Sequence, residues 1–199
     1  MNRAFFIAIS IFLLFSPMAY YIGDFEIGAG SHVNVASTPP TTGDWNISDE
    51  TIIQDTTYII NSSIIIQSGG SLVLINSVLY MNLTYPLEYK IEVQNGGNLT
   101  LINSKITAYN TSNPYRVTIH NSASFSMRGS ELSYAGNTNN VGIYVYAPNT
   151  VIRDSKFLEV YRPYFSAQDI MITNTTFMKC GQGVDFSYSE DVYFFNNTI

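Results

Sequence analysis

One eight-residue pattern recurs six times after residue 70, and it constrains the fold of this chain more than any other feature. The pattern reads apolar-x-apolar-x-Asn-small polar-x-apolar, and its clearest copies begin at Leu72 and Leu99. The fifth position of the six copies is Asn76, Asn103, Gly129, Asp154, Asn174 and Asn196. The copies are therefore 27, 26, 25, 20 and 22 residues apart. A period of this length, with the alternation of a β-strand inside each copy, predicts a solenoid with one coil per repeat.

The positions of the pattern have distinct expected roles. The alternating apolar residues should point inward, where stacked coils bury them. The fifth position suits a sharp bend between two strands, because Asn, Asp and Gly tolerate the left-handed backbone conformation. Since coils stack about 4.8 Å apart, side chains at the bend can bond along the axis as a structural ladder. The expected ladder residues are Asn76, Asn103, Asp154, Asn174 and Asn196. The small polar residue that follows, Ser77 in the first copy, should form a second ladder.

The alternative fold is a meander of antiparallel hairpins, which needs a tight turn between neighbouring strands. Of the two-residue hairpin signals, only Asn95 followed by Gly96 is convincing. We therefore predict parallel coils.

The two clearest coils carry a family resemblance. The segments Gly-Gly-Ser-Leu-Val-Leu-Ile-Asn-Ser (69–77) and Gly-Gly-Asn-Leu-Thr-Leu-Ile-Asn-Ser (96–104) resemble repeats of the right-handed parallel β-helix, the pectate-lyase-like superfold. They are most similar to the exported and surface β-helix proteins of archaea. The resemblance covers residues 45–199 and implies an all-β, right-handed parallel β-helix of about six to seven coils. The superfold hosts lyases, hydrolases, adhesins and binding proteins alike, so the fold alone does not give an activity.

The first 23 residues have the features of a targeting segment. Arg3 precedes an uncharged stretch over 4–23, which is long enough to act as a signal peptide or as an uncleaved membrane anchor. We expect a protein that is secreted or membrane-anchored at the cell surface, with membrane contact only through this segment. A flexible Gly-, Ser-, Thr- and Pro-rich linker should cover 24–43, and the β-helix domain should cover 44–199.

Composition excludes some partners and points to surface modification. A net charge of −6 with only nine Lys and Arg argues against nucleic acid. Cys180 is the single cysteine, so the chain has no internal disulfide, and we expect a small core residue there. Seven Asn-x-Ser/Thr sequons occur. Asn82 and Asn110 lie in the longer expected loops and are the best candidates for glycosylation.

A second strand precedes each later copy of the pattern, and its outward positions are rich in tyrosine. The candidate ligand-binding residues on this face are Tyr144, Tyr146, Tyr164, His120 and Asp185. Aromatic faces can stack on sugar rings while polar neighbours bind hydroxyls, which favours cell-surface or extracellular glycans as ligands. The alternative is a plain surface, because tyrosine is common in exposed strands.

Charged residues offer little catalytic chemistry. Asp169, Glu190 and Asp191 recur one coil apart and could form an acidic patch that binds Ca²⁺ through oxygen ligands. No other cofactor is expected. His120 is the only histidine of the solenoid, which argues against a His-rich metal site or a Ser-His-Asp arrangement. We predict no catalytic residue.

These observations favour a structural or carbohydrate-binding surface module. A polysaccharide lyase or glycoside hydrolase, with catalytic coils beyond residue 199, is the first alternative. A self-assembling surface subunit is the second. The pattern reaches its eighth position at Ile199 without a cap, so we expect further coils of a longer chain, or a neighbouring subunit, to cover the open end.

Overall fold

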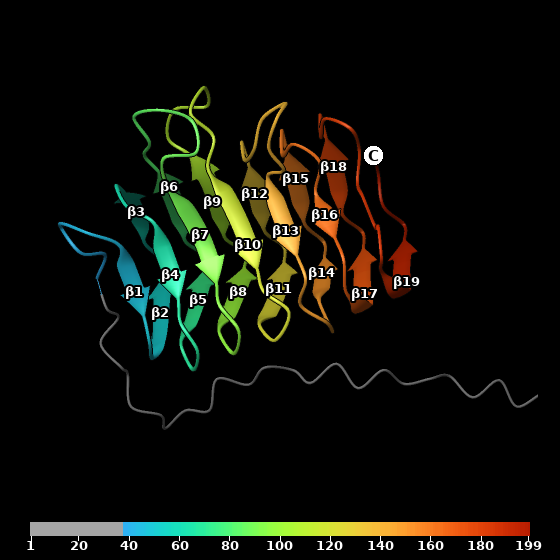
Figure 1. Ribbon diagram of the computed structural model, residues 1–199, viewed down its shortest axis with the longest axis horizontal. Coiled ribbons are helices and arrows are strands. Elements are labelled where there is room, and N and C mark those ends of the chain that lie inside the picture. Colours follow the sequence, from blue (N-terminus) through green and yellow to red (C-terminus); the bar gives the residue numbers. More distant parts are fainter. Residues whose placement is uncertain (1–37) are drawn as a thin grey trace, which may run out of the picture. The chain divides into compact units, whose positions relative to one another are not determined.

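The computed structural model describes residues 38–199, which form a right-handed β-solenoid of about six turns without helices (Figure 1). Each full coil supplies one strand to each of three sheets, which we call sheets A, B and C. All pairings between neighbouring strands are parallel, as the repeat predicts; for example, β5 pairs with β2 on one side and β8 on the other. The antiparallel meander is therefore excluded. The targeting segment predicted over 1–23, and the linker up to residue 37, lie outside the described residues.

The strand bounds follow the repeat closely. Sheet A contains β1 (Trp45–Ile47), β4 (Ile64–Ile66), β7 (Lys90–Val93), β10 (Arg116–Ile119), β13 (Ile143–Val145) and β16 (Tyr164–Phe165). Sheet B contains β2 (Glu50–Gln54), β5 (Ser71–Ile75), β8 (Asn98–Ile102), β11 (Ser124–Arg128), β14 (Val151–Arg153), β17 (Gln168–Thr173) and β19 (Glu190–Phe195). Sheet C contains β3 (Thr57–Ile60), β6 (Val78–Met81), β9 (Lys105–Ala108), β12 (Glu131–Ser133), β15 (Lys156–Leu158) and β18 (Thr176–Met178).

The core lies inside the three sheets and is built from the alternating apolar positions. Leu72, Leu99 and Phe125 are paired on successive coils and are at most 2% exposed. Towards the later coils the core becomes aromatic, and the buried rings of Phe157 and Phe177 stack with centroids 4.9 Å apart. Apolar residues therefore stack on equivalent positions of successive coils through the interior.

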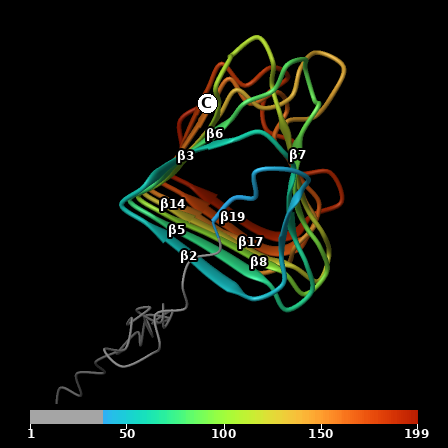
Figure 2. The ribbon, with the colours of Figure 1, turned by 90° about the vertical axis from the view of Figure 1, so that its left-hand side faces the viewer.

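A sharp corner joins sheets B and C, and the Asn position of the repeat forms it (Figure 2). All six bend residues have positive φ, between 48° and 57°. The Asn196 amide donates to Asn174 Oδ1 at 2.6 Å, and the Asn174 amide donates to Asp154 Oδ1 at 3.0 Å. In the first coils, the Asn76 amide donates to Asp55 at 3.1 Å. Gly129 interrupts the ladder because it has no side chain. A Cβ at this position would overlap the side-chain oxygen of Asn103 on the preceding coil.

The next position of the repeat forms a second, buried ladder of hydroxyl groups. The Ser77 N–H donates to Ser104 Oγ at 3.0 Å, and the Ser104 N–H donates to Ser130 Oγ at 3.1 Å. Each hydroxyl in turn donates to the carbonyl two residues before it, as Ser104 does to Ile102 at 2.8 Å. Ser77, Ser104 and Ser130 are at most 4% exposed. The ladder therefore supplies hydrogen-bond acceptors for backbone N–H groups at the corner, which have no partner within the sheets.

Loops of unequal length project where sheet C returns to sheet A (Figure 2). The first spans only 61–63, the next three span 82–89, 109–115 and 134–142, and the last is again short, at 159–163. The loops bond across coils, as the Leu87 N–H does to the Pro114 carbonyl at 2.7 Å. One expected strand is missing: 184–186 contributes only an isolated bridge between Asp185 and Tyr164. Over residues 38–199, no helix is long and apolar enough to cross a membrane.

Candidate functional site

The outer face of sheet A carries the residues that the sequence predicts for ligand binding. The register places Glu92, Thr118 and Tyr144 side by side on successive coils. Tyr164 follows Tyr144 in the same file, and an isolated bridge pairs Tyr164 with Asp185. A single file of outward side chains therefore runs along the solenoid axis, in which Tyr144 and Tyr164 are followed by Asp185.

Three tyrosines form the centre of this face, and we call Tyr144, Tyr146 and Tyr164 the tyrosine cluster. The rings of Tyr144 and Tyr146 are nearly parallel, with centroids 6.0 Å apart and an interplanar angle of 11°. The Tyr164 ring lies edge-on to both, at centroid distances of 5.7 and 6.1 Å. Burial, and then the two neighbouring tyrosines, raise the pKa of Tyr146, so its hydroxyl stays neutral and can both donate and accept.

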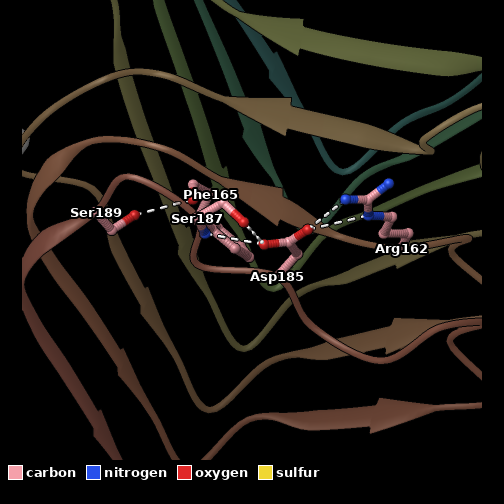
Figure 3. Close-up of polar contacts among 5 residues, drawn as sticks. All are labelled: Arg162, Phe165, Asp185, Ser187 and Ser189. Atoms are coloured by element: carbon pink, nitrogen blue, oxygen red, sulfur yellow. Dashed lines mark hydrogen bonds and ion pairs between the residues drawn. The ribbon is translucent and has the colours of Figure 1, made fainter.

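Arg162 and Asp185 form an ion pair beside the cluster, and Figure 3 shows this pair with Ser187. Arg162 donates from Nε and Nη2 to Asp185 Oδ2, at 3.0 and 2.6 Å. The other oxygen of Asp185 accepts from both the backbone N–H and the hydroxyl of Ser187. The hydrogen bonds from Ser187 and then from Arg162 lower the pKa of Asp185 and keep it ionised. This carboxylate therefore holds the Arg162 guanidinium 5.9 Å from the ring centroid of Tyr164, within reach of a cation–π interaction.

An ion-paired group also lies at the other end of the face. Glu92 Oε2 is 2.6 Å from Lys90 Nζ, and Glu92 Oε1 is 2.9 Å from His120 Nε2. The hydrogen bond from Lys90 lowers the pKa of Glu92 more than burial raises it. His120 and Tyr146 directly follow the last paired residues of β10 and β13, Ile119 and Val145, and the Tyr146 N–H donates to the Ile119 carbonyl at 2.9 Å. Ion pairs therefore fix the polar side chains on both sides of the tyrosine cluster.

The structure brings the five predicted ligand-binding residues onto one surface. These are Tyr144, Tyr146, Tyr164, His120 and Asp185. Sequence reasoning missed Arg162 and Ser166 as members of this surface. Continuing the alternation past Phe165 would have found Ser166, whose N–H donates to the Val145 carbonyl at 2.9 Å. Arg162 lies in a turn with φ of 47°, where alternation does not say which way a side chain points.

The acidic patch expected to bind Ca²⁺ is not formed. Among residues 38–199, no three His, Cys, Asp or Glu side chains gather closely enough to hold a metal ion. Asp169 and Asp191 have φ of 55° and 52°, and the pairing of β17 with β19 skips both. Glu190 accepts a hydrogen bond from Gln168 Nε2 at 2.8 Å. The one-coil spacing of these residues suggested the patch, but spacing alone does not say where side chains point at positions where the backbone turns, as it does at the two aspartates.

The two predicted glycosylation sites differ in the state of the amide nitrogen that a sugar would be attached to. The Asn82 Nδ2 donates to Asn61 Oδ1 on the preceding coil at 2.7 Å. Asn110 is exposed. Its Oδ1 accepts the Ser112 N–H at 3.1 Å, so the amide oxygen, and not the Nδ2 that would carry the sugar, makes this hydrogen bond. Asn110 is therefore the better placed acceptor of the two.

Cys180 is not poised as a nucleophile. Burial raises the pKa of its thiol to about 11, so the reactive thiolate is scarce at neutral pH. Its Sγ lies 3.7 Å from the Phe157 carbonyl oxygen, and the side chain packs against the core.

The coil geometry and the bend ladder define a parallel β-solenoid protein with an aromatic and polar outer face. The chain belongs to the family described as "Right handed beta helix region", whose model matches residues 42–199. No curated protein and no solved structure matches the chain. Membership of this family establishes the fold, and the function has to come from the surface itself.

Proposed function

We propose that this β-helix is an exported cell-surface module that binds glycans on the outer face of sheet A. The tyrosine cluster carries the proposal: three rings lie within 5.7 to 6.1 Å of one another on a surface fixed by ion pairs. Export is supported by the targeting pattern of residues 1–23, and a net charge of −6 suits an extracellular domain better than a nucleic-acid binder.

The cluster combines the two properties that sugar recognition needs. Tyrosine offers a large, rigid apolar face and a polar tip at a small cost in side-chain entropy. The rings are also held in place, because Tyr164 contacts both other tyrosines and lies under Arg162. Preorganisation of this kind reduces the entropy lost on binding. Ring faces would then stack on sugar rings, and the tyrosine hydroxyls and Ser166 would bond to sugar hydroxyls.

Tyr144→Ala tests the role of the cluster. We expect the dissociation constant for a bound polysaccharide to rise about tenfold, which corresponds to about 1.4 kcal/mol. The melting temperature should change little, because Tyr144 lies on an outer face. Affinity gel electrophoresis of the purified 199-residue chain against a polysaccharide panel, together with thermal unfolding, measures both. Tyr109→Ala is the matched control, since this tyrosine is 57% exposed and lies in a loop outside the cluster. Equal binding by both variants and the unmodified chain would remove the tyrosine cluster from consideration.

We also propose that the exported protein is glycosylated, with Asn110 the preferred sequon. In a host that performs N-glycosylation, we expect glycopeptide mass spectrometry to find high occupancy at Asn110 and low occupancy at Asn82. The physical reason is the hydrogen bond that engages the Asn82 nitrogen with Asn61. Asn61→Ala frees that nitrogen and should raise occupancy at Asn82. High occupancy at Asn82 in the unmodified protein would contradict this order.

A further inference from the structure

An uncharged depression of about 330 Å³ lies at the corner where sheet A turns into sheet B. Two successive turns form its walls, and the start of β8 and β11 forms its floor. Its polar and turn residues are Asn98, Ser122, Ser124, Ser126, Pro148 and Asn149. This volume falls at the lower end of small-ligand pockets, which span about 300–1,000 Å³.

The depression adjoins the tyrosine cluster. Pro148 follows Tyr146 by two residues, and only the buried Ala147 lies between them. On the preceding coil, Ser122 follows His120 by two residues in the same way. Because β10 and β13 are paired, the two segments that leave sheet A, 120–122 and 146–148, reach the corner side by side. A chain-like ligand lying on the tyrosines could therefore continue round the corner into the depression.

The lining carries no charge, and its hydroxyl and amide groups are interspersed with the apolar groups of Ala123, Phe125 and Pro148. Two of its polar groups are already oriented: Asn98 Nδ2 donates to Ser71 Oγ at 2.9 Å, and Ser126 Oγ donates to Thr100 Oγ1 at 3.2 Å. Within the described part of the chain, the hydroxyls of Ser122 and Ser124 have no hydrogen-bond partner. Uncharged donors and acceptors suit a polyhydroxyl ligand, whereas an ionised group entering here would lose hydration without meeting a cation.

We propose that this depression is a second sugar subsite and that the ligand is a neutral oligosaccharide that bends from the tyrosine cluster round the corner between sheets A and B. This inference rests on the proposed function, and it adds the chemical class of the glycan and the path that it follows. The negative net charge of the chain also disfavours a polyanionic glycan.

Filling the depression tests the proposal. Ser124→Leu places a bulky apolar side chain at an exposed lining position. If this variant folds poorly, Ser122→Leu does the same from the turn directly before β11. The probes are soluble glucan, mannan and galactan, the disaccharides derived from them, and alginate as the acidic comparison. We expect Ser124→Leu in the 199-residue chain to weaken binding of a neutral polymer about tenfold and to leave disaccharide binding unchanged. Thr173→Leu, on the same outer face of sheet B but outside the depression, should change neither.

The outcomes separate this subsite from the tyrosine cluster. Unchanged polymer binding by both serine variants, with weaker binding by Tyr144→Ala, would overturn the subsite and leave the proposed function standing. Weaker polymer binding by the serine variants alone would support the subsite and overturn the role of the tyrosines. Tighter binding of alginate than of every neutral polymer, or no binding of any neutral polymer, would overturn the assignment of a neutral ligand.

Discussion

Replacing Phe157 by alanine is expected to lower the free energy of unfolding by about 3–5 kcal/mol, the range for a large buried aromatic residue. Phe157 is fully buried, and its ring stacks on Phe177 with an interplanar angle of 7°. Truncation removes contacts with the coils on both sides and leaves a cavity that the stacked backbone cannot close. Denaturant unfolding followed by far-UV circular dichroism measures the loss.

Two further variants make the Phe157 result interpretable. Phe157→Leu keeps most of the volume, so its cost should be clearly smaller than that of alanine. Phe195→Ala removes a ring of the same type that is 61% exposed, and it should cost less than about 0.5 kcal/mol. Similar losses for Phe157→Ala and Phe195→Ala would show that the aromatic stack does not hold the later coils together.

Ser104→Ala should destabilise the protein by about 1–3 kcal/mol, because it leaves a buried N–H without a partner. The affected group is the Ser77 N–H, which donates to the Ser104 hydroxyl. The carbonyl of Ile102 loses the hydroxyl but still accepts the Asn76 N–H at 3.0 Å, so the acceptor side stays satisfied. Equilibrium urea unfolding gives the free-energy difference.

Ser68→Ala is the matched control for the hydroxyl ladder. Ser68 is exposed in a turn, so the loss of its hydroxyl should have almost no effect on stability. Ser104→Thr keeps the hydroxyl and should recover part of the loss. A Ser104→Ala variant as stable as Ser68→Ala would mean that water or backbone adjustment replaces the missing bond.

The bend between sheets B and C could be predicted because it uses residues with a local preference for positive φ. A second set of bends, at the end of the sheet C strands, could not. Tyr134, Glu159 and Lys179 adopt φ of 53° to 55° there, although none of these residue types favours that conformation. Backbone hydrogen bonds between coils hold these bends: the Tyr134 N–H donates to the Leu158 carbonyl, and the Glu159 N–H to the Met178 carbonyl, both at 2.9 Å. Such contacts depend on the stacked fold and leave no pattern in the sequence.

The candidate site could likewise be predicted from the sequence only in part. Alternation correctly placed Tyr144 and Tyr164 in one file, because their strands pair without a shift. The corner depression was not predicted, because its walls come from two turns whose relative position depends on how coils of different length stack. Asp169 and Asp191 stand one coil apart as expected, between residues that pair in β17 and β19, but that spacing did not predict a Ca²⁺ patch correctly because the backbone turns at both positions.

The hydroxyl ladder also bears on how a protein of this kind can lengthen or shorten during evolution. Each hydroxyl serves its own strand and the coil before it, as Ser130 does for its own Arg128 carbonyl and for the Ser104 N–H. A duplication or loss of one whole repeat reproduces this arrangement at the new junction, whereas a change of a few residues places a hydroxyl opposite the wrong group. Whole coils are therefore the natural unit of insertion and deletion, and smaller changes are confined to the loops between sheets C and A.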